Sequence, residues 1–336
     1  MIAVAIINYK TAAATLACIE SLQAQSGQSK HIHLLDNGSG EAEAESLRSY
    51  ASSRAASLSF TASPTNLGFA GGMNVLFRSA LADPNVEHVL LLNSDTRPTP
   101  GFLDAMIAAL DSSQRVEMVA ARLLHPADQT TESIGIALYR STLASNRKNE
   151  DDILLGPTGG CALLTRRLLE DVEKTYGYWF DEQFFCYAED TDLVIRARWL
   201  GYVPAFAASA TVYHAGSLSS GGPDNEFVLY HGIRNSLWWL VKDAPLGWLL
   251  RSIPWFVALH CGIVLRHVRR GRARVVWRLY RDALKGVPSM LRKRRVVSAA
   301  RRVPRDEFAR WVTPRFYERD YVRSAWRELW SKRRDR

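Results

Sequence analysis

The sequence predicts an α/β protein in which a mixed, mostly parallel sheet is flanked by helices and followed by a helical C-terminal extension. Two observations indicate this fold class. Compact apolar runs alternate with helix-like stretches near the start of the chain, which is typical of parallel strands joined by crossover helices. Each apolar run also ends in a polar turn, and α/β proteins bind ligands at the carboxyl edge of such a sheet.

Four apolar runs are the predicted strands of the first half of the sheet, at 2–7, 31–35, 58–62 and 88–92. Helix-like stretches separate them, most clearly at 11–26 and 72–82. Four polar residues fall at or just after the ends of these strands: Asn8, Asp36, Asn66 and Asn93. Because parallel strands end at one edge of a sheet, we expect these side chains near a common ligand site.

The pattern continues with a predicted helix at 101–111 and a strand or strand pair at 116–124. From 125 to 152 the sequence is polar and aperiodic, which predicts a long surface loop of the kind that covers or selects a substrate in enzymes. Ordered pattern resumes at 159–164, and a helix that begins near Asp190 ends at Gly201.

The composition favours a folded protein in a reducing compartment. With 47% hydrophobic and 23% charged residues, the 336-residue chain can bury a core. The four cysteines are far apart in the sequence and form no C-x-x-C pair, so we predict neither a disulfide framework nor a thiolate metal site. The apolar start at 1–8 has no basic leader and no cleavage site, and it indicates a buried strand instead of a signal peptide.

Charge is distributed unevenly along the chain. Residues 1–265 hold 19 basic and 27 acidic side chains, a net −8, whereas residues 266–336 hold 24 basic and 7 acidic ones, a net +17. A tail with this charge is typical of a segment that binds a polyanionic surface, either anionic lipid or nucleic acid. The preceding segment 246–268 is apolar and rich in Trp, but Arg251, Pro254 and His260 interrupt it, which favours an interfacial amphipathic helix over a bilayer span.

Two acidic motifs are candidates for chemistry. Asn93-Ser94-Asp95 follows a predicted strand directly. The triplet alone supports two interpretations of Asp95 equally: it holds a hard cation between two phosphates, or it caps the turn that follows. Downstream, Glu189, Asp190 and Asp192 place three carboxylates within four positions. Like charges repel, so this gathering indicates a helix N-terminus, a cation or a proton-transfer role, and the aromatic residues just before it favour a cleft.

Three further features have both a functional and a structural interpretation. His214 ends a short apolar run and gains weight as a ligand only if Asp95 lies nearby. The glycine-rich turn 66–74 opens a helix, where backbone N–H groups can approach phosphate or ribose, or where glycine simply permits a tight turn. Arg234 can pair with a diphosphate or with a surface carboxylate.

In order, these elements resemble family 2 glycosyltransferases with a GT-A fold, in particular the rhamnosyltransferase-like subgroup of bacterial cell-surface polysaccharide assembly. The segments that carry the resemblance cover residues 2 to 240 and are Ile7-Asn8-Tyr9, Asp36-Asn37-Gly38-Ser39, 66–72, 92–96, Gly159-Gly160-Cys161, 189–192, His214 and Arg234-Asn235.

The resemblance implies roles for these residues. Asp95 and His214 become metal ligands for Mg²⁺ or Mn²⁺, and Asn93 in the D-x-D-like triplet removes one negative charge. Asp190 becomes the base that deprotonates the acceptor hydroxyl in a single inverting displacement, with Glu189 and Asp192 supporting it. The residues expected to bind the nucleotide sugar are Asn8, Tyr9, Asp36, Asn66, Gly68, Asn74, Asn93 and Arg234.

The resemblance also implies an organisation and partners. Residues 1–240 form the catalytic domain, with a nucleotide half to about residue 100 and an acceptor half after it, and 241–336 form a basic membrane-associating extension. Asp36 would contact the pyrimidine N3–H, which uracil and thymine share, so a UDP- or dTDP-sugar is expected and the subgroup mildly favours dTDP-rhamnose. The acceptor would be a saccharide or lipid-linked, and the enzyme cytoplasmic, peripheral on the inner face of the membrane.

Three other classes of protein compete with this interpretation. A nucleic-acid-binding protein would explain the basic tail, but no recognised nucleic-acid module is present and we expect no such partner. A non-catalytic membrane scaffold would have no need of clustered carboxylates, which are costly to keep. A nucleotidyltransferase would need a basic triphosphate loop near the first strand, where Lys10 stands alone.

Overall fold

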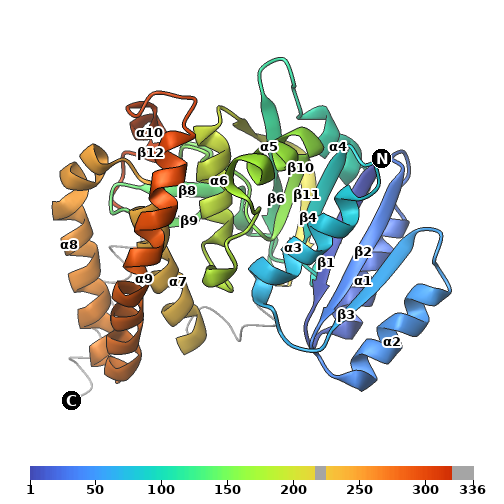
Figure 1. The fold of residues 1–336 in the computed structure, drawn as a ribbon. Helices are drawn as coiled ribbons and strands as arrows, with labels where there is room; N and C mark the ends of the chain where they lie inside the picture. Colours follow the sequence, from blue (N-terminus) through green and yellow to red (C-terminus); the bar gives the residue numbers. More distant parts are fainter. Residues whose placement is uncertain (216–224, 320–336) are drawn as a thin grey trace.

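The computed structural model describes residues 1–215 and 225–319, and a nine-stranded mixed sheet forms its centre (Figure 1). One half of this sheet is parallel and the other half is mixed. In spatial order the strands are β3 (Leu58–Ser63), β2 (Lys30–Asn37), β1 (Ile2–Asn8), β4 (His88–Leu92), β10 (Cys161–Thr165), β6 (Val116–Leu124), β11 (Val203–His214) and β5 (Thr96–Pro98), and β7 (Thr131–Ser133) pairs with β6.

The parallel half of the sheet confirms the four strands predicted from apolar runs. β1, β2, β3 and β4 pair in parallel, and the register sets Asn8 opposite Asp36. The carboxyl ends of β1 and β2 therefore lie side by side. This arrangement brings the polar residues at these strand ends close together, as the sequence predicts. β10 then enters antiparallel between β4 and β6, which makes the sheet mixed. The predicted fold class, a helix-flanked mixed sheet with a helical C-terminal region, is confirmed.

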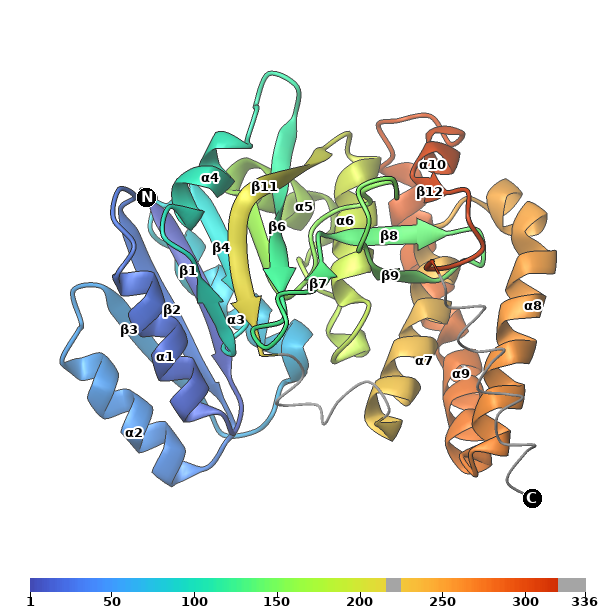
Figure 2. The ribbon, with the colours of Figure 1, turned by 180° about the vertical axis from the view of Figure 1, so that it is seen from behind.

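Helices cover both faces of the sheet (Figures 1 and 2). One buried cluster packs the first face against α1 (Ala12–Gln23), α2 (Glu41–Ser52) and α4 (Phe102–Ala108). A second cluster packs the other face against α3 (Gly68–Leu81), α5 (Arg166–Tyr176) and α6 (Glu189–Trp199). The sheet therefore separates two apolar layers, and its carboxyl edge stays open for a site.

The prediction of a long surface loop at 125–152 is wrong. This region contains β7, β8 (Ile136–Tyr139) and β9 (Ala144–Asn146), and every residue of β8 is buried. β8 and β9 form a second sheet with β12 (Val312–Thr313), which comes from the far end of the chain. An apolar run of four residues, such as β8, is too short to show the alternating pattern of a strand. Its partner β12 is also too distant in the sequence to reveal the pairing.

The C-terminal helices lie at the end of the molecule opposite β3 (Figures 1 and 2). They are α7 (Glu226–Asp243), which spans the predicted boundary at residue 240, α8 (Leu246–Arg269), α9 (Ala273–Ala299) and the short α10 (Glu307–Arg310). α7 packs between α6 and α9. Buried ion pairs reinforce this packing, because Lys242 of α7 contacts Asp192 of α6 and Lys293 of α9 contacts Asp181.

Helix α8 is the most weakly covered of these elements. Among the described residues it is the one helix long and apolar enough to cross a membrane, with a mean hydropathy of 1.5 over its best 18-residue stretch, and only 17% of that stretch is buried. Leu250, Ile253 and Val257 are 58%, 49% and 50% exposed. Their spacing of three and four residues places them on one stripe of the helix.

Candidate active site

A cavity of about 910 Å³ opens at the carboxyl edge of β1, β2 and β4. Ile7 and Tyr9 line it after β1, Asn37 after β2, and the turn after β4 closes one side. Eight of the residues singled out in the sequence line this one cavity: Tyr9, Asn66, Gly68, Asn93, Asp95, Glu189, Asp190 and His214. The two acidic motifs and the histidine, far apart in the sequence, therefore meet.

Strand pairing brings Asp95 and His214 together. β5 follows Asp95 directly and pairs antiparallel with β11, so that His214 lies opposite Thr96. His214 Nε2 lies 3.0 Å from Asp95 Oδ1 and 3.4 Å from Asn93 Nδ2. Its other nitrogen, Nδ1, lies 2.7 Å from Glu132 Oε2, so two carboxylates flank the imidazole ring.

This setting changes the protonation of His214. Burial alone would lower the pKa of the imidazole, but the hydrogen bonds to Asp95 and Glu132, together with the negative charges of both carboxylates, outweigh burial and raise the pKa to about 10. With no metal bound the ring is therefore cationic at neutral pH and neutralises the two carboxylates, and a metal ion at Nε2 would have to displace its proton. Sequence reasoning missed Glu132, because the pairing of β7 with β6 that positions it lies within the region predicted to be a loop.

The donor set fits a divalent cation. Among the described residues, no group of three His, Cys, Asp or Glu side chains surrounds a common point, so the protein offers two donors here, Asp95 and His214. Mg²⁺ accepts such sites, because it binds one or two protein ligands and completes its octahedron with substrate phosphates and water. Glu132, 2.7 Å from His214 Nδ1, would orient the histidine if a metal were bound.

Asp190 lies at the first turn of α6 and lines the same cavity. Its Oδ2 accepts a hydrogen bond of 2.8 Å from the Gly159 N–H, and its Oδ1 accepts one of 2.6 Å from the Thr191 N–H. Burial raises the pKa of this carboxyl, and the backbone hydrogen bonds partly offset the rise. Burial also raises the pKa of Glu189 well above its usual range, and the charge of Asp190 adds to that. Raised carboxyl pKa values in a cleft are typical of general bases.

A strained loop holds the start of α6. Phe185, Tyr187 and Ala188 have φ values of +65°, +71° and +64°, which non-glycine residues rarely adopt. The buried amide nitrogen of Asn235 compensates by approaching three carbonyl oxygens of this loop, those of Phe184, Cys186 and Tyr187, at 2.9, 2.8 and 2.7 Å. Asn235 therefore positions the segment that leads to Asp190, a role that sequence reasoning missed although the Arg234-Asn235 pair carried the resemblance.

The same loop contacts the glycine-rich turn on the nucleotide side. The Phe185 carbonyl accepts a hydrogen bond of 3.1 Å from the Ala70 N–H, and a Cβ added at Gly68, where φ is +72°, would collide with that carbonyl. Asn37 fixes the turn by donating to Asn66 Oδ1 and to the Gly68 carbonyl, both at 3.1 Å. The glycine is required here both by its backbone conformation and by this close approach.

Five residues singled out in the sequence do not line the cavity. Asn8 donates to Asp36 at 2.8 Å, and both are buried behind the strand ends. Asn74 bonds the main chain of Phe180, and Arg234 donates to the Phe184 carbonyl at 3.1 Å and stacks on Trp238. The fifth, Asp192, is fully buried in ion pairs.

Comparison with known proteins gives similarity at two levels. A model of the glycosyl transferase family 2 matches residues 3–173. Over 126 residues the chain is 32% identical to the N-acetylglucosaminyl-diphospho-decaprenol L-rhamnosyltransferase of Mycobacterium tuberculosis, in strains CDC 1551 and H37Rv. That alignment covers 35% of this chain, and the chain spans 38% of the relative's length.

Several solved structures share the fold at low sequence identity. Mannosyltransferase PcManGT of Pyrobaculum calidifontis, with GDP-Man and Mn²⁺, superposes with a TM-score of 0.54 at 14% identity, over 89% of this chain and 85% of its own. GalNAc-T7 with UDP, GalNAc and Mn²⁺ gives 0.55 at 12%, over 72% and 48%. Staphylococcus aureus TarS 1–349 with UDP-GlcNAc gives 0.52 at 14%, over 89% and 83%.

Proposed function

Because the chain belongs to the glycosyl transferase family 2 and has a GT-A fold, we propose that it transfers a sugar from a nucleoside diphosphate sugar to an acceptor hydroxyl, with inversion at the anomeric carbon. One observation carries this proposal: a single cavity joins a half-buried carboxylate of raised pKa, Asp190, with the Asp95 and His214 pair. A displacement of a diphosphate needs a base on one side and charge stabilisation on the other.

In this proposal Asp190 is the base. Its Oδ2 faces Gly159 and its Oδ1 faces Thr191, so the loop and the helix start hold the carboxylate still. It takes the proton from the acceptor hydroxyl as that oxygen attacks the anomeric carbon, and the bond to the diphosphate breaks in the same step. No covalent intermediate with the enzyme is required. Glu189 is buried beside it, and burial together with the charge of Asp190 raises the pKa of Glu189.

The opposite side of the reaction belongs to Asp95 and His214. These two residues would hold Mg²⁺ or Mn²⁺, which when bound supplies the positive charge that stabilises the leaving diphosphate. Glu132 keeps His214 oriented from behind through its 2.7 Å contact with Nδ1. Removal of divalent cation with EDTA should therefore stop transfer, and adding Mn²⁺ or Mg²⁺ should restore it.

We propose a UDP- or dTDP-sugar as the donor, with dTDP-rhamnose foremost, and a saccharide or lipid-linked acceptor. The support is the M. tuberculosis relative, whose name specifies an L-rhamnosyl donor group and a diphospho-decaprenol acceptor. The test is release of nucleoside diphosphate from a panel of nucleotide sugars by the wild-type chain and by Asp190→Asn. Sugar transfer by Asp190→Asn at the wild-type rate would refute the assignment of the base.

We further propose that the enzyme works as a peripheral protein on the cytoplasmic, anionic face of a membrane. The exposed apolar stripe of α8 and the basic residues beyond it support this placement. Replacing Leu250, Ile253 and Val257 together with glutamine leaves the core intact, because all three are exposed. The triple variant should lose co-sedimentation with phosphatidylglycerol vesicles, and undiminished co-sedimentation would contradict the proposal.

A further inference from the structure

The second sheet builds one wall of the active-site cavity, around its strand β9. We call this the β9 wall, and its members are Leu143, Ala144, Ser145, Asn146 and Lys148. Consecutive side chains of a strand point to opposite faces, yet all three residues of β9 line the cavity. β9 is the last strand in the order β12-β8-β9, so it turns its edge to the cavity and presents polar groups there.

The β9 wall lies on the side of the cavity that holds the base. β8, the partner of β9, exchanges hydrogen bonds with the chain that leads to Gly159: the Ile136 N–H donates to the Gly156 carbonyl at 2.7 Å, and the Leu155 N–H donates to the Ile136 carbonyl at 2.8 Å. Gly159 in turn holds Asp190 Oδ2. β8 and β9 also lie across the central sheet from β1, β2 and β3 (Figure 2). Because the base takes its proton from the acceptor, the acceptor occupies this side.

A segment from the far end of the chain runs along this wall. We call residues 312–319 the C-terminal strap, and they lie beyond the residues matched by the family model. After β12 has paired with β8, the strap continues beside the chain that joins β8 to β9. The Arg140 N–H donates to the Arg315 carbonyl at 3.0 Å, and the Ser141 N–H donates to the Phe316 carbonyl at 3.1 Å. The main chain therefore fixes where the next residues of the strap stand.

Glu318 of the strap holds two polar side chains of the β9 wall. Its Oε1 accepts a hydrogen bond from the Ser145 hydroxyl, and its Oε2 lies 3.2 Å from Lys148 Nζ. The Glu318 side chain is 21% exposed, whereas that of Lys148 is 47% exposed and lines the cavity. An ammonium has three N–H donors, and a hydroxyl that donates its hydrogen still accepts. Lys148 and Ser145 can therefore contact Glu318 and a sugar hydroxyl together.

We propose that Lys148 and Ser145 bind hydroxyl groups of the acceptor sugar and that Glu318 positions both side chains. Glu318 acts through these two residues and does not touch the substrate. The inference rests on the proposed function and adds to it the residues that select the acceptor sugar. Since the contacts are with sugar hydroxyls, they do not depend on the group that carries the sugar.

The test follows transfer from dTDP-rhamnose to octyl N-acetylglucosaminide, a water-soluble saccharide. The variants are Lys148→Met, which keeps the stem and removes the ammonium, Ser145→Ala, and Glu318→Gln, which removes the charge and keeps the size. Lys148→Arg retains a cation that reaches Glu318. The double variant Lys148→Met with Glu318→Gln asks whether Glu318 acts through Lys148. For each chain we measure kcat, the KM of each substrate and the melting temperature.

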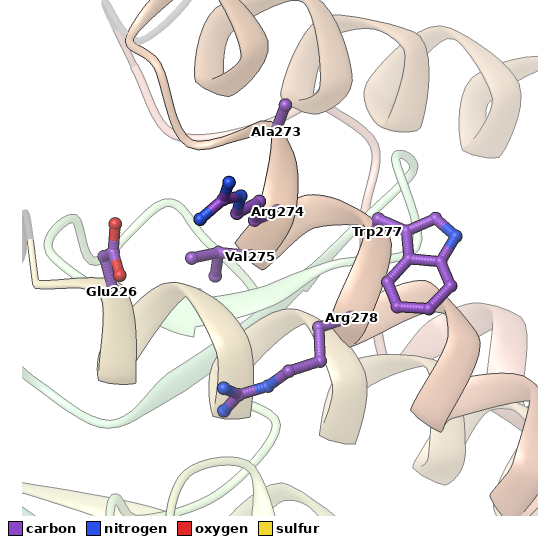
Figure 3. A pocket seen from close by; sticks show the side chains of 6 residues that line it. All are labelled: Glu226, Ala273, Arg274, Val275, Trp277 and Arg278. Atoms are coloured by element: carbon purple, nitrogen blue, oxygen red, sulfur yellow. The ribbon is translucent and has the colours of Figure 1, made fainter.

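Two matched controls remove a charge outside the cavity. Arg319→Gln changes the next residue of the strap, whose ion pair with Asp151 involves no residue of the cavity lining. Arg274→Met removes an exposed cation on α9, which lines a separate hollow of about 660 Å³ with Glu226 (Figure 3). Both controls should match the wild-type chain in every constant.

We expect Lys148→Met to raise the acceptor KM by about tenfold, because a hydrogen bond from a charged donor is lost. The kcat at saturating acceptor, the donor KM and the melting temperature should stay at wild-type values, and Lys148→Arg should restore most of the acceptor KM. Ser145→Ala and Glu318→Gln should each raise the acceptor KM by about threefold. In the Lys148→Met background, Glu318→Gln should have no further effect.

Three results would overturn the inference. The first is a wild-type acceptor KM in Lys148→Met. The second is an equal rise of the donor KM and the acceptor KM, which indicates a general disturbance of the cavity. The third is a Glu318→Gln effect of the same size with and without Lys148, which shows that Glu318 does not act through this side chain.

A binding measurement separates this inference from the proposed function. Calorimetry gives the dissociation constant of octyl N-acetylglucosaminide without any donor. If the wild-type chain binds it and Lys148→Met binds it about tenfold more weakly, yet no nucleotide sugar supports transfer, the inference stands and the proposed function fails. If the wild-type chain transfers sugar and all variants bind the saccharide equally well, the proposed function stands and the inference fails.

Discussion

Replacing Asp192 with Asn tests whether this member of the acidic triplet is structural. Asp192 is fully buried, with its Oδ1 2.5 Å from Lys242 Nζ and its Oδ2 2.8 Å from Arg196 Nη2. These charges hold the pKa of Asp192 below its usual range despite burial. Asparagine has almost the same shape, so the substitution removes the negative charge and leaves the packing intact.

The magnitude follows from what remains around the two cations. Removing one partner of a buried ion pair costs about 3–5 kcal/mol, because a charge is left uncompensated. Lys242 keeps its 3.0 Å contact with Asp181. Burial and the charge of Asp192 raise the pKa of the neighbouring Asp243, and removing the charge of Asp192 takes away the second of these causes. We therefore expect a loss near the lower end, about 3 kcal/mol, and a fall in Tm of about 5 °C or more.

The assay pairs Asp192→Asn with Asp190→Asn. Unfolding by urea is followed by tryptophan fluorescence, and turnover is measured on the folded protein well below the transition. Asp192→Asn should lose stability and keep most of its kcat, whereas Asp190→Asn should keep its stability and lose about 10²–10⁴-fold in kcat. Wild-type stability with abolished turnover in Asp192→Asn would show that this carboxylate acts in the chemistry.

Three further outcomes are expected. Burial raises the pKa of Asp190 above 3.8, and a base acts only when ionised, so log kcat/KM should be flat at higher pH and fall with unit slope below a midpoint above 3.8; a midpoint at or below 3.8 would contradict this. Glu132→Gln should weaken Mn²⁺ binding by about 10–100-fold, measured by calorimetry, since His214 loses the carboxylate that orients it, and unchanged affinity would remove Glu132 from the site. Asn235→Asp should lower kcat with little change in donor KM, because a carboxylate facing three carbonyl oxygens releases the strained loop; Leu47→Ala, a core change in α2, serves as the control for instability alone.

The parallel half of the fold follows from the sequence because its signals are local. Each of β1, β2 and β4 is an apolar run flanked by polar residues, and their parallel order needs no distant partner to be inferred. β8 is different, since β12 from residues 312–313 covers one of its edges and β9 the other. Because β8 is buried by a segment so distant in the sequence, the residues of β8 alone do not show the hydrophobic pattern that predicts a strand.

The site divides in the same way. The cavity joins Asp95, His214 and Asp190 as the motifs indicate, because each stands at the end of a strand or the start of a helix. Glu132 and Asn235 could not be found from residue type, since a polar side chain at those positions looks like any surface residue. Asp192 was grouped with the two cavity carboxylates by proximity in sequence, but the helix turns it to the buried side, toward Arg196 and Lys242.

The pairing of β12 with β8 makes the order of synthesis matter. Leu143 and Ala144, which follow β8, line the cavity together with Tyr317, four residues after Thr313. A ribosome that has translated the central sheet, Asp95, Asp190 and His214 has therefore still not made the chain that closes this side of the cavity. The nascent protein therefore cannot complete this side of the cavity until residues 312–317 have left the exit tunnel, after the C-terminal helices have also been made.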